Sequence, residues 1–228
     1  MDGKPELRGN AFAVSSNLAV TANHNLDNIT GKIFVANEVY SGLGFRETSA
    51  RVVVKFGYDI SEDWALLLIV EGEPFPVHAS IAPEEGLPAI GDKIFIKNFP
   101  IDLAVTAETK LTLHSTHSKV TQYDTRTKNK KTTTKGPHLV PEAECVVDLN
   151  GPEDEVMVQT GRVGGSCGAP YFNERGEVFA FHVASIDDSD TGSSVSQGSY
   201  VFYSIGRVLC RLPNFMSCWH DATRSPSV

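Results

Sequence analysis

The stretch VGGSCGAPYF (163–172) places a hydroxyl and a thiol side by side, at Ser166 and Cys167. Either group can attack a carbonyl carbon once a neighbouring base has taken its proton. The glycines around the pair permit a tight turn with positive φ angles, and such a turn can direct successive backbone N–H groups into one small concavity. The segment therefore predicts a nucleophile beside an oxyanion hole. An ordinary tight turn with a partly buried cysteine is the alternative explanation.

A base and an acid stand at the ends of two apolar runs earlier in the chain. His24 follows the apolar part of NLAVTANHNL, and Asp63 precedes that of SEDWALLLIV. A His held at the rim of a buried strand can take a proton, and a carboxylate that accepts its other ring N–H fixes the tautomer. Glu62 can take the same role as Asp63, and Asp59 is a weaker candidate. Taken singly, a rim His and a turn carboxylate are ordinary surface residues.

The composition limits the classes of function. The 228 residues are 41% hydrophobic and 21% charged, with a formal net charge of −8 and a pI of about 5.3. This charge argues against nucleic acid as the dominant partner. No apolar run approaches the roughly 20 residues of a membrane helix, and MDGKPELRGN has no apolar core of a secretory signal. We therefore expect no membrane contact and a reducing compartment.

The cysteines give no sign of a metal site. The four of them, Cys145, Cys167, Cys210 and Cys218, form no CxxC pair and match no zinc spacing. The other histidines also lack the spacing of ligands. We expect neither a metal nor an organic cofactor, and in a reducing compartment the thiols are expected to be free. A free cysteine in a glycine-rich turn is then a candidate nucleophile.

Short apolar or alternating runs separated by turn residues predict an all-β protein. No long stretch has a helical period, and one short helix is expected within 206–218. The connection IAPEEGLPAIGDK (81–93) divides the chain into two predicted units, 1–85 and 86–228. The predicted strands are 10–15, 17–21, 32–36, 49–56, 64–70, 93–98, 102–107, 110–122, 144–149, 155–160, 169–173, 177–184 and 199–204.

Three motifs in this chain order resemble those of the chymotrypsin-like protease superfamily. AVTANH is similar to the strand that carries its catalytic His, DWALL to the strand that carries its acid, and GSCGAP to its nucleophile turn. The resemblance implies two six-stranded antiparallel β-barrels with the active site in the cleft between them. It assigns His24 and Asp63 to the first barrel, and it makes Cys167 the nucleophile. The oxyanion hole then consists of backbone N–H groups of Gly165, Ser166 and Cys167.

A cysteine nucleophile on this fold resembles a narrower group, the 3C-like proteases of picornavirus-like positive-strand RNA viruses. CGAPY matches their nucleophile core, and GEVFAFHVAS resembles the strand whose His lies at the bottom of the S1 pocket. The resemblance implies that His182 recognises Gln or Glu at P1 and that the substrate is a viral polyprotein in the host cytoplasm. Tyr200 and Tyr203 are the candidates to hold the His182 tautomer.

One departure affects the predicted S1 pocket. These proteases have a Thr five residues before the nucleophile, where this chain has Arg162, and Thr160 is the nearest substitute. Arg162 facing the pocket would favour Glu over Gln at P1. Ala184, two residues after His182, is expected to contact the substrate as well. His182 can otherwise be a core histidine with no role in binding.

Three other interpretations remain open. The chain can be a cellular or bacterial trypsin-like peptidase with a Cys nucleophile, which would cut after Arg or Lys. It can be an inactive protease fold that binds a partner. The basic segment 125–136 can fold over a substrate as a β-ribbon or bind RNA weakly, although a solvated loop is the commoner explanation. Its basic residues are Arg126, Lys128, Lys130, Lys131 and Lys135.

Overall fold

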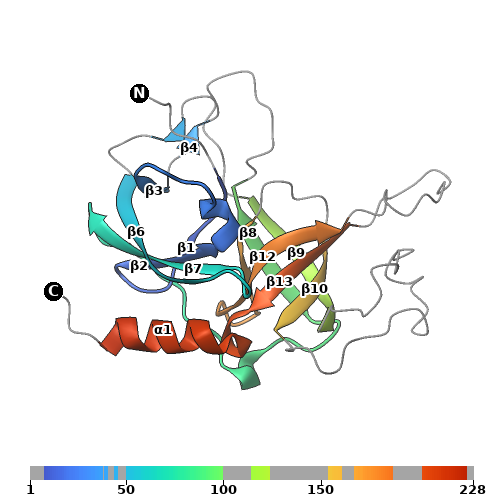
Figure 1. Ribbon diagram of the computed structural model, residues 1–228. Coiled ribbons are helices and arrows are strands. Elements are labelled where there is room, and N and C mark those ends of the chain that lie inside the picture. Colours follow the sequence, from blue (N-terminus) through green and yellow to red (C-terminus); the bar gives the residue numbers. More distant parts are fainter. Residues whose placement is uncertain are drawn as a thin grey trace.

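The computed structural model shows two antiparallel β units and one C-terminal α-helix (Figure 1). The structure describes residues 8–37, 39–40, 44–45, 50–99, 114–123, 154–160, 167–186 and 202–224.

The N-terminal unit is a five-stranded antiparallel sheet with the order β1-β2-β7-β6-β3. Two of its inner strands, β2 and β7, are nearly continuous apolar runs; β2 is buried throughout and β7 over its first four residues. A separate two-stranded pair, β4-β5, accompanies the sheet, so the described strands do not form a single six-stranded sheet here. The strands are β1 (Phe12–Ala13), β2 (Leu18–Ala22), β3 (Ile33–Ala36), β4 (Val39–Tyr40), β5 (Gly44–Phe45), β6 (Ala50–Asp59) and β7 (Trp64–Glu71).

The C-terminal unit is a closed six-stranded barrel with the order β10-β13-β12-β11-β8-β9. The prediction of a six-stranded antiparallel barrel is confirmed here. The predicted strands 102–107 and 144–149 lie outside the described residues. The barrel strands are β8 (Lys93–Asn98), β9 (His114–Tyr123), β10 (Glu155–Thr160), β11 (Pro170–Phe172), β12 (Val178–Ile186) and β13 (Phe202–Val208).

The C-terminal helix begins later than the sequence predicted. Strand β13 continues to Val208, a 3-10 turn (η5, Leu209–Arg211) follows, and α1 spans Pro213–Arg224. Pro213 opens the helix because proline is favoured at the first helical position, where its missing N–H has no intrahelical partner to lose. Figure 1 shows α1 lying across the N-terminal sheet rather than on the barrel that precedes it.

The packing of α1 joins the two ends of the chain. The buried ring of Phe215 meets the buried ring of Trp64 edge to face, with 5.4 Å between ring centroids. One core cluster contains Phe12 and Trp64 of the first sheet together with Phe181 of the barrel and Phe215 of the helix. The two units therefore share apolar packing. The domain boundary between residues 85 and 86 stays a prediction. It lies in the connection between Glu71 and Lys93, which contains one short 3-10 turn (η3, Glu84–Gly86) and an isolated β-bridge from Ile81 to Val178.

Candidate active site

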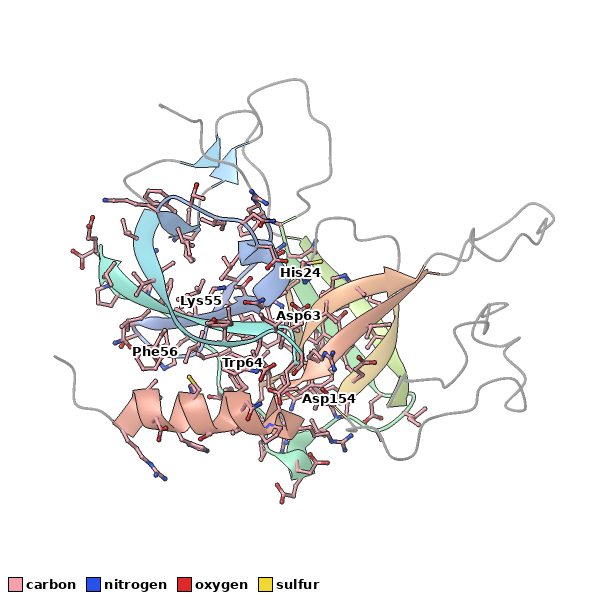
Figure 2. The ribbon with its side chains drawn as sticks, in the orientation of Figure 1. His24, Lys55, Phe56, Asp63, Trp64 and Asp154 are labelled. Atoms are coloured by element: carbon pink, nitrogen blue, oxygen red, sulfur yellow. The ribbon has the colours of Figure 1, made fainter. Side chains whose placement is uncertain are left out.

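His24 and Asp63 come together because the strands that carry them are neighbours. Strands β2 and β7 pair antiparallel with Ala22 opposite Trp64, so the end of one lies beside the start of the other. His24 lies in a 3-10 turn (η1, Asn23–Leu26) that follows β2 directly. Its Nδ1 is 2.7 Å from Asp63 Oδ2, and its backbone N–H donates to Asp63 Oδ1 at 3.0 Å. Figure 2 shows the two residues together between the N-terminal sheet and the barrel.

The structure distinguishes the three candidate carboxylates. Glu62 accepts a hydrogen bond from Trp64 Nε1 at 2.7 Å, and Asp59 accepts from the backbone N–H groups of Ser61 and Glu62. Only Asp63 among these three is hydrogen bonded to His24. Its φ angle is 54°, a left-handed conformation that is uncommon outside glycine and tends to occur at functional sites. Among the three carboxylates, Asp63 is therefore the one that contacts the His24 imidazole.

The C-terminal part of the chain holds the turn that carries Asp63. Arg207 on β13 donates through Nη2 to the carbonyl of Ser61 at 3.3 Å, while its Nη1 pairs with Asp154 at 2.7 Å. Asn214 at the start of α1 donates to Asp59 Oδ2 at 2.8 Å. These contacts fix the turn from the barrel and from the helix.

Cys167 reaches the same place from the barrel. Its carbonyl accepts hydrogen bonds from Asn10 N at 2.8 Å and Asn25 Nδ2 at 3.0 Å, both in the N-terminal unit. Its thiol Sγ is 3.6 Å from the Val183 carbonyl, to which it donates. Gly168 follows with a φ angle of 86°, and a Cβ at this position would overlap the Asn10 carbonyl. Only glycine fits this conformation and this close approach of backbones.

The pKa of His24 depends on two neighbouring side chains, those of Asp63 and Cys167. Hydrogen bonds with Asp63 and then with Cys167 raise the pKa of His24 to about 10, although partial burial opposes them. The imidazole is therefore protonated at neutral pH. A positive charge beside a cysteine can stabilise its thiolate, which is the reactive form.

His182 is buried on β12, with 3% of its surface exposed. Its Nδ1 lies 2.7 Å from the Tyr171 hydroxyl, and Tyr171 in turn is hydrogen bonded to the Ser204 side chain. Burial, followed by the positive charge of His24, lowers the pKa of His182 to about 4. Burial raises the pKa of the Tyr171 phenol, so both groups are neutral near pH 7.

The described partner of His182 is a residue that the sequence analysis did not name. Tyr171 is hydrogen bonded to the ring. Tyr200 lies outside the described residues and the Tyr203 side chain is not among those described, so their expected role stays a prediction. Tyr171 pairs with Ala180 in the β11–β12 hairpin, so it lies diagonal to His182 on the same face of the sheet. The hairpin register, with its tyrosine two positions from the histidine, is the signal that would have identified it.

Gly206 is a further residue near His182 that the sequence alone did not identify. It lies opposite His182 on β13, and a Cβ there would come within 2.6 Å of the Tyr171 ring. The pairing of β12 with β13 shifts at Val183, which forms a bulge between His182 and Ala184. Bulges re-aim side chains and are common beside active sites. Here the bulge directs the Val183 carbonyl toward Cys167 Sγ.

The remaining predicted residues are only partly within the described chain. Thr160 ends β10, opposite Phe202, and its side chain is not described. Ala184 is exposed on β12. Arg162, Gly165, Ser166 and the basic run within 125–136 lie outside the described residues, so no contact of theirs is known.

Neither a metal cluster nor a membrane helix is found in the part of the chain that the structure describes. No three His, Cys, Asp or Glu residues there gather closely enough to hold a metal ion. None of the helices described has the length and apolar character that crossing a bilayer demands. The expectation that no cofactor takes part stays a prediction.

Comparison with known proteins identifies the fold. No family model and no curated protein matches this sequence. The HtrA-type protease AlgW, solved with a decapeptide, superimposes with a TM-score of 0.55 at 16% identity; the match covers 93% of this chain and 52% of that one, so this chain spans about half of AlgW. An inactive mutant of Rv3671c from M. tuberculosis H37Rv gives a TM-score of 0.52 at 11% identity, covering 96% of this chain and 84% of that one.

These matches confirm the predicted all-β, two-barrel fold of the chymotrypsin-like proteases. At such low identities the likeness concerns the fold alone. Neither description names a viral protein or a cysteine protease, so those finer resemblances stay predictions.

Proposed function

We propose that this chain is a cysteine endopeptidase in which Cys167 is the nucleophile, His24 the acid–base group and Asp63 the residue that orients it. One observation carries the proposal: the imidazole of His24 is hydrogen bonded to Asp63 at 2.7 Å, and Cys167 acts together with Asp63 to raise the pKa of that imidazole. These residues come from the two β units and are separated by 39 and 143 positions, since 63 − 24 = 39 and 167 − 24 = 143. An inactive protease fold would have no need for such an arrangement.

The mechanism follows from the protonation of His24. Its raised pKa favours an imidazolium that stabilises the Cys167 thiolate as an ion pair. The thiolate attacks the carbonyl carbon of the scissile peptide bond, and His24 then gives its proton to the leaving amine. Water attacks the resulting thioester while His24 takes a proton from it, and this releases the acid product and regenerates the thiol–imidazole pair. Backbone N–H groups of Gly165, Ser166 and Cys167 would stabilise the oxyanion.

The substrate pocket is proposed to be built on His182. With the Tyr171 hydroxyl donating to Nδ1, the proton of the neutral ring lies on Nε2, which can donate to the side-chain oxygen of Gln or Glu at P1. A neutral imidazole suits an amide or carboxyl group better than the cation of Lys or Arg. Thr160, Arg162 and Ala184 are proposed to complete this pocket.

A trypsin-like peptidase outside the viral group is the second candidate, and it fits the two structural neighbours better than a viral enzyme does. It shares the His24–Asp63–Cys167 chemistry and differs in substrate. Cleavage of a viral polyprotein in the host cytoplasm, a reducing compartment suited to a thiolate, is supported by GSCGAPY and His182 alone.

A digest of a proteome-derived peptide library tests the proposal and separates the candidates. Wild type and Cys167→Ala are incubated with the library under reducing conditions, and the cleavage sites are read by mass spectrometry. We expect cuts after Gln or Glu that disappear with Cys167→Ala and persist with Ser166→Ala. Cuts after Arg or Lys would retain the nucleophile and support the trypsin-like candidate. Absence of cleavage by folded wild type would contradict the endopeptidase proposal.

A further inference from the structure

Four residues form a closed, buried ring of hydrogen bonds behind the proposed nucleophile. Asn25 Nδ2 donates to the Cys167 carbonyl at 3.0 Å and to Thr21 Oγ1 at 3.0 Å. The Thr21 hydroxyl donates to the Asn10 carbonyl at 2.7 Å, and Asn10 N donates back to the Cys167 carbonyl at 2.8 Å. Asn10, Thr21 and Asn25 are all buried polar residues of the N-terminal unit, whereas Cys167 enters from the barrel.

The ring fixes the Cys167–Gly168 peptide in orientation. A carbonyl oxygen has two lone pairs, and that of Cys167 uses both, one on Asn10 N and one on Asn25 Nδ2. The other end of the same peptide, the Gly168 N–H, donates to the His182 carbonyl at 2.8 Å. With both ends bonded, this peptide cannot rotate without breaking buried hydrogen bonds, which are costly to leave unmade.

Asn25 is adjacent in sequence to His24, in the same 3-10 turn. The two side chains point to different partners: His24 is exposed and reaches Asp63, while Asn25 has 6% of its surface exposed and reaches Cys167. One turn therefore contacts the acid through one residue and the nucleophile through the next. The separation of Sγ from the imidazole depends on this turn because base and nucleophile come from different β units.

We propose that Asn25 is a positioning residue that sets Cys167 against His24 through the Cys167 carbonyl, with Thr21 and Asn10 holding its amide in place. This inference rests on the proposed function, in which Cys167 and His24 act as a pair. Loss of the amide leaves the thiol in the barrel but lets its peptide move relative to the imidazole. The thiol then reacts more like an ordinary cysteine.

Alkylation of Cys167 at two pH values tests this without a peptide substrate. Iodoacetamide is added at pH 6.5 and pH 9.5, and modification of the Cys167 peptide is followed by mass spectrometry. In wild type we expect fast alkylation at both values, because the imidazolium stabilises the thiolate at the lower one. Asn25→Ala should slow the reaction at pH 6.5 by roughly tenfold, the factor equivalent to one buried hydrogen bond, and leave the rate at pH 9.5 unchanged.

Asn173→Ala is the matched control. Asn173 is also buried and makes several hydrogen bonds through its side chain, to Gly86, Arg175 and Glu177, in the β11–β12 turn. Its loss should lower the thermal stability of the protein and leave the pH dependence of Cys167 alkylation as in wild type. An equal change in both variants would show a general loss of stability and would overturn the positioning role.

Further outcomes separate this inference from the function on which it rests. If Asn25→Ala does not fold, Thr21→Val removes the hydroxyl that anchors the Asn25 amide while keeping a β-branched residue in β2, and a smaller shift in the same direction is expected. A folded Asn25→Ala or Thr21→Val with the wild-type profile overturns the role of Asn25. A wild-type Cys167 that behaves as an ordinary thiol, in a protein that cuts no peptide, overturns the proposed function instead.

Discussion

Two adjacent carboxylates, at positions 62 and 63, have separate partners in the structure. Asp63 accepts both the ring N–H and the backbone N–H of His24, whereas Glu62 accepts from the indole of Trp64. The contact with Nδ1 keeps the imidazole in one tautomer and one orientation, and the contact with the backbone N–H holds the carboxylate in place. We therefore expect substitution of Asp63 to affect His24 directly, and substitution of Glu62 to leave it unchanged.

Asp63→Asn should lower kcat/KM, because the amide no longer stabilises the imidazolium or fixes its tautomer. We expect a loss of tenfold or more that stays smaller than the loss for His24→Ala, which removes general acid–base catalysis worth roughly 10²–10⁴-fold. Glu62→Gln is the matched control and should retain activity close to that of wild type. Steady-state rates on one peptide identified from the library measure all three variants. Equal losses for Glu62→Gln and Asp63→Asn would contradict the assignment.

Much of the site at this scale could be predicted from residue types and their positions at strand ends. His24, Asp63, Cys167 and His182 all belong to motifs that are short and local in sequence. Tyr171 and Asn25 were missed because their roles depend on a diagonal contact across a hairpin and on a contact spanning 142 residues. The contact of Asn25 leaves no local pattern in the sequence, and that of Tyr171 can be found only once the register of the hairpin is known.

The β11–β12 hairpin, facing β13, is the element that joins the nucleophile to the proposed S1 pocket. His182 N donates to the Ala169 carbonyl at 2.8 Å, and Gly168 N donates to the His182 carbonyl, so the nucleophile turn continues directly into the His182 strand. Gly206 on β13 leaves the space that the Tyr171 ring occupies. We therefore expect the orientation of His182 to depend on Gly206, through the ring of Tyr171.

Gly206→Ala should impair substrate selection more than chemistry. The added Cβ would press on the Tyr171 ring and disturb its hydrogen bond to His182, so we expect KM for the best P1 residue to rise, with roughly the tenfold effect of one lost hydrogen bond. Alkylation of Cys167 should remain as in wild type. Gly31→Ala is the control, because a Cβ there would meet nothing within 4 Å. A fall in kcat with unchanged KM would argue against this role of Gly206.

Most strands could be predicted because the apolar runs are short, alternate or contain many β-branched residues, as in KIFIKN and WALLLIV. The helix was placed too early because the sequence from 202 to 208 pairs with both β10 and β12, and this tertiary pairing fixes it as strand. The return of α1 to the N-terminal sheet was not predictable, since Phe215 and Trp64 meet only through the tertiary fold.

Across the whole molecule, the contributions of the two proposed functional histidines to the free energy of unfolding change with pH in opposite directions. The pKa of His182 is lowered to about 4 by burial, and the pKa of His24 is raised to about 10 by Asp63 and Cys167. The contribution of His182 is present above about pH 6.5 and is lost as pH falls toward 4. The contribution of His24 is present below about pH 6.5 and is lost as pH rises toward 10.

We therefore expect the free energy of unfolding to be highest near neutral pH. Protonation of His182 in the unfolded chain should cost the folded state up to roughly 3 kcal/mol at the acid end, by the equivalence of 1.36 kcal/mol per pKa unit. Urea unfolding at pH 4.5, 7 and 9.5 measures this. His182→Gln should flatten the acid limb alone and His24→Gln the alkaline limb alone. An acid limb that is unchanged by His182→Gln would show that other groups control it.

The two β units and α1 form one body around the site. Arg207 and Asn214 hold the turn before Asp63 from the C-terminal side, while Asn10 and Asn25 hold Cys167 from the N-terminal side. Each unit thus supports the proposed functional residue that the other contributes. We therefore expect the proposed chemistry to require both units, packed together as in the whole molecule.

The most direct test of the account is detection of the acyl group on the enzyme. A peptide cleaved by wild type is mixed with the enzyme, the reaction is quenched with acid at short times, and the modified residue is mapped by mass spectrometry. We expect the acyl part of the substrate on Cys167, as a thioester that hydroxylamine removes. An acyl group on Ser166, or cleavage that persists in Cys167→Ala without any covalent adduct, would contradict it.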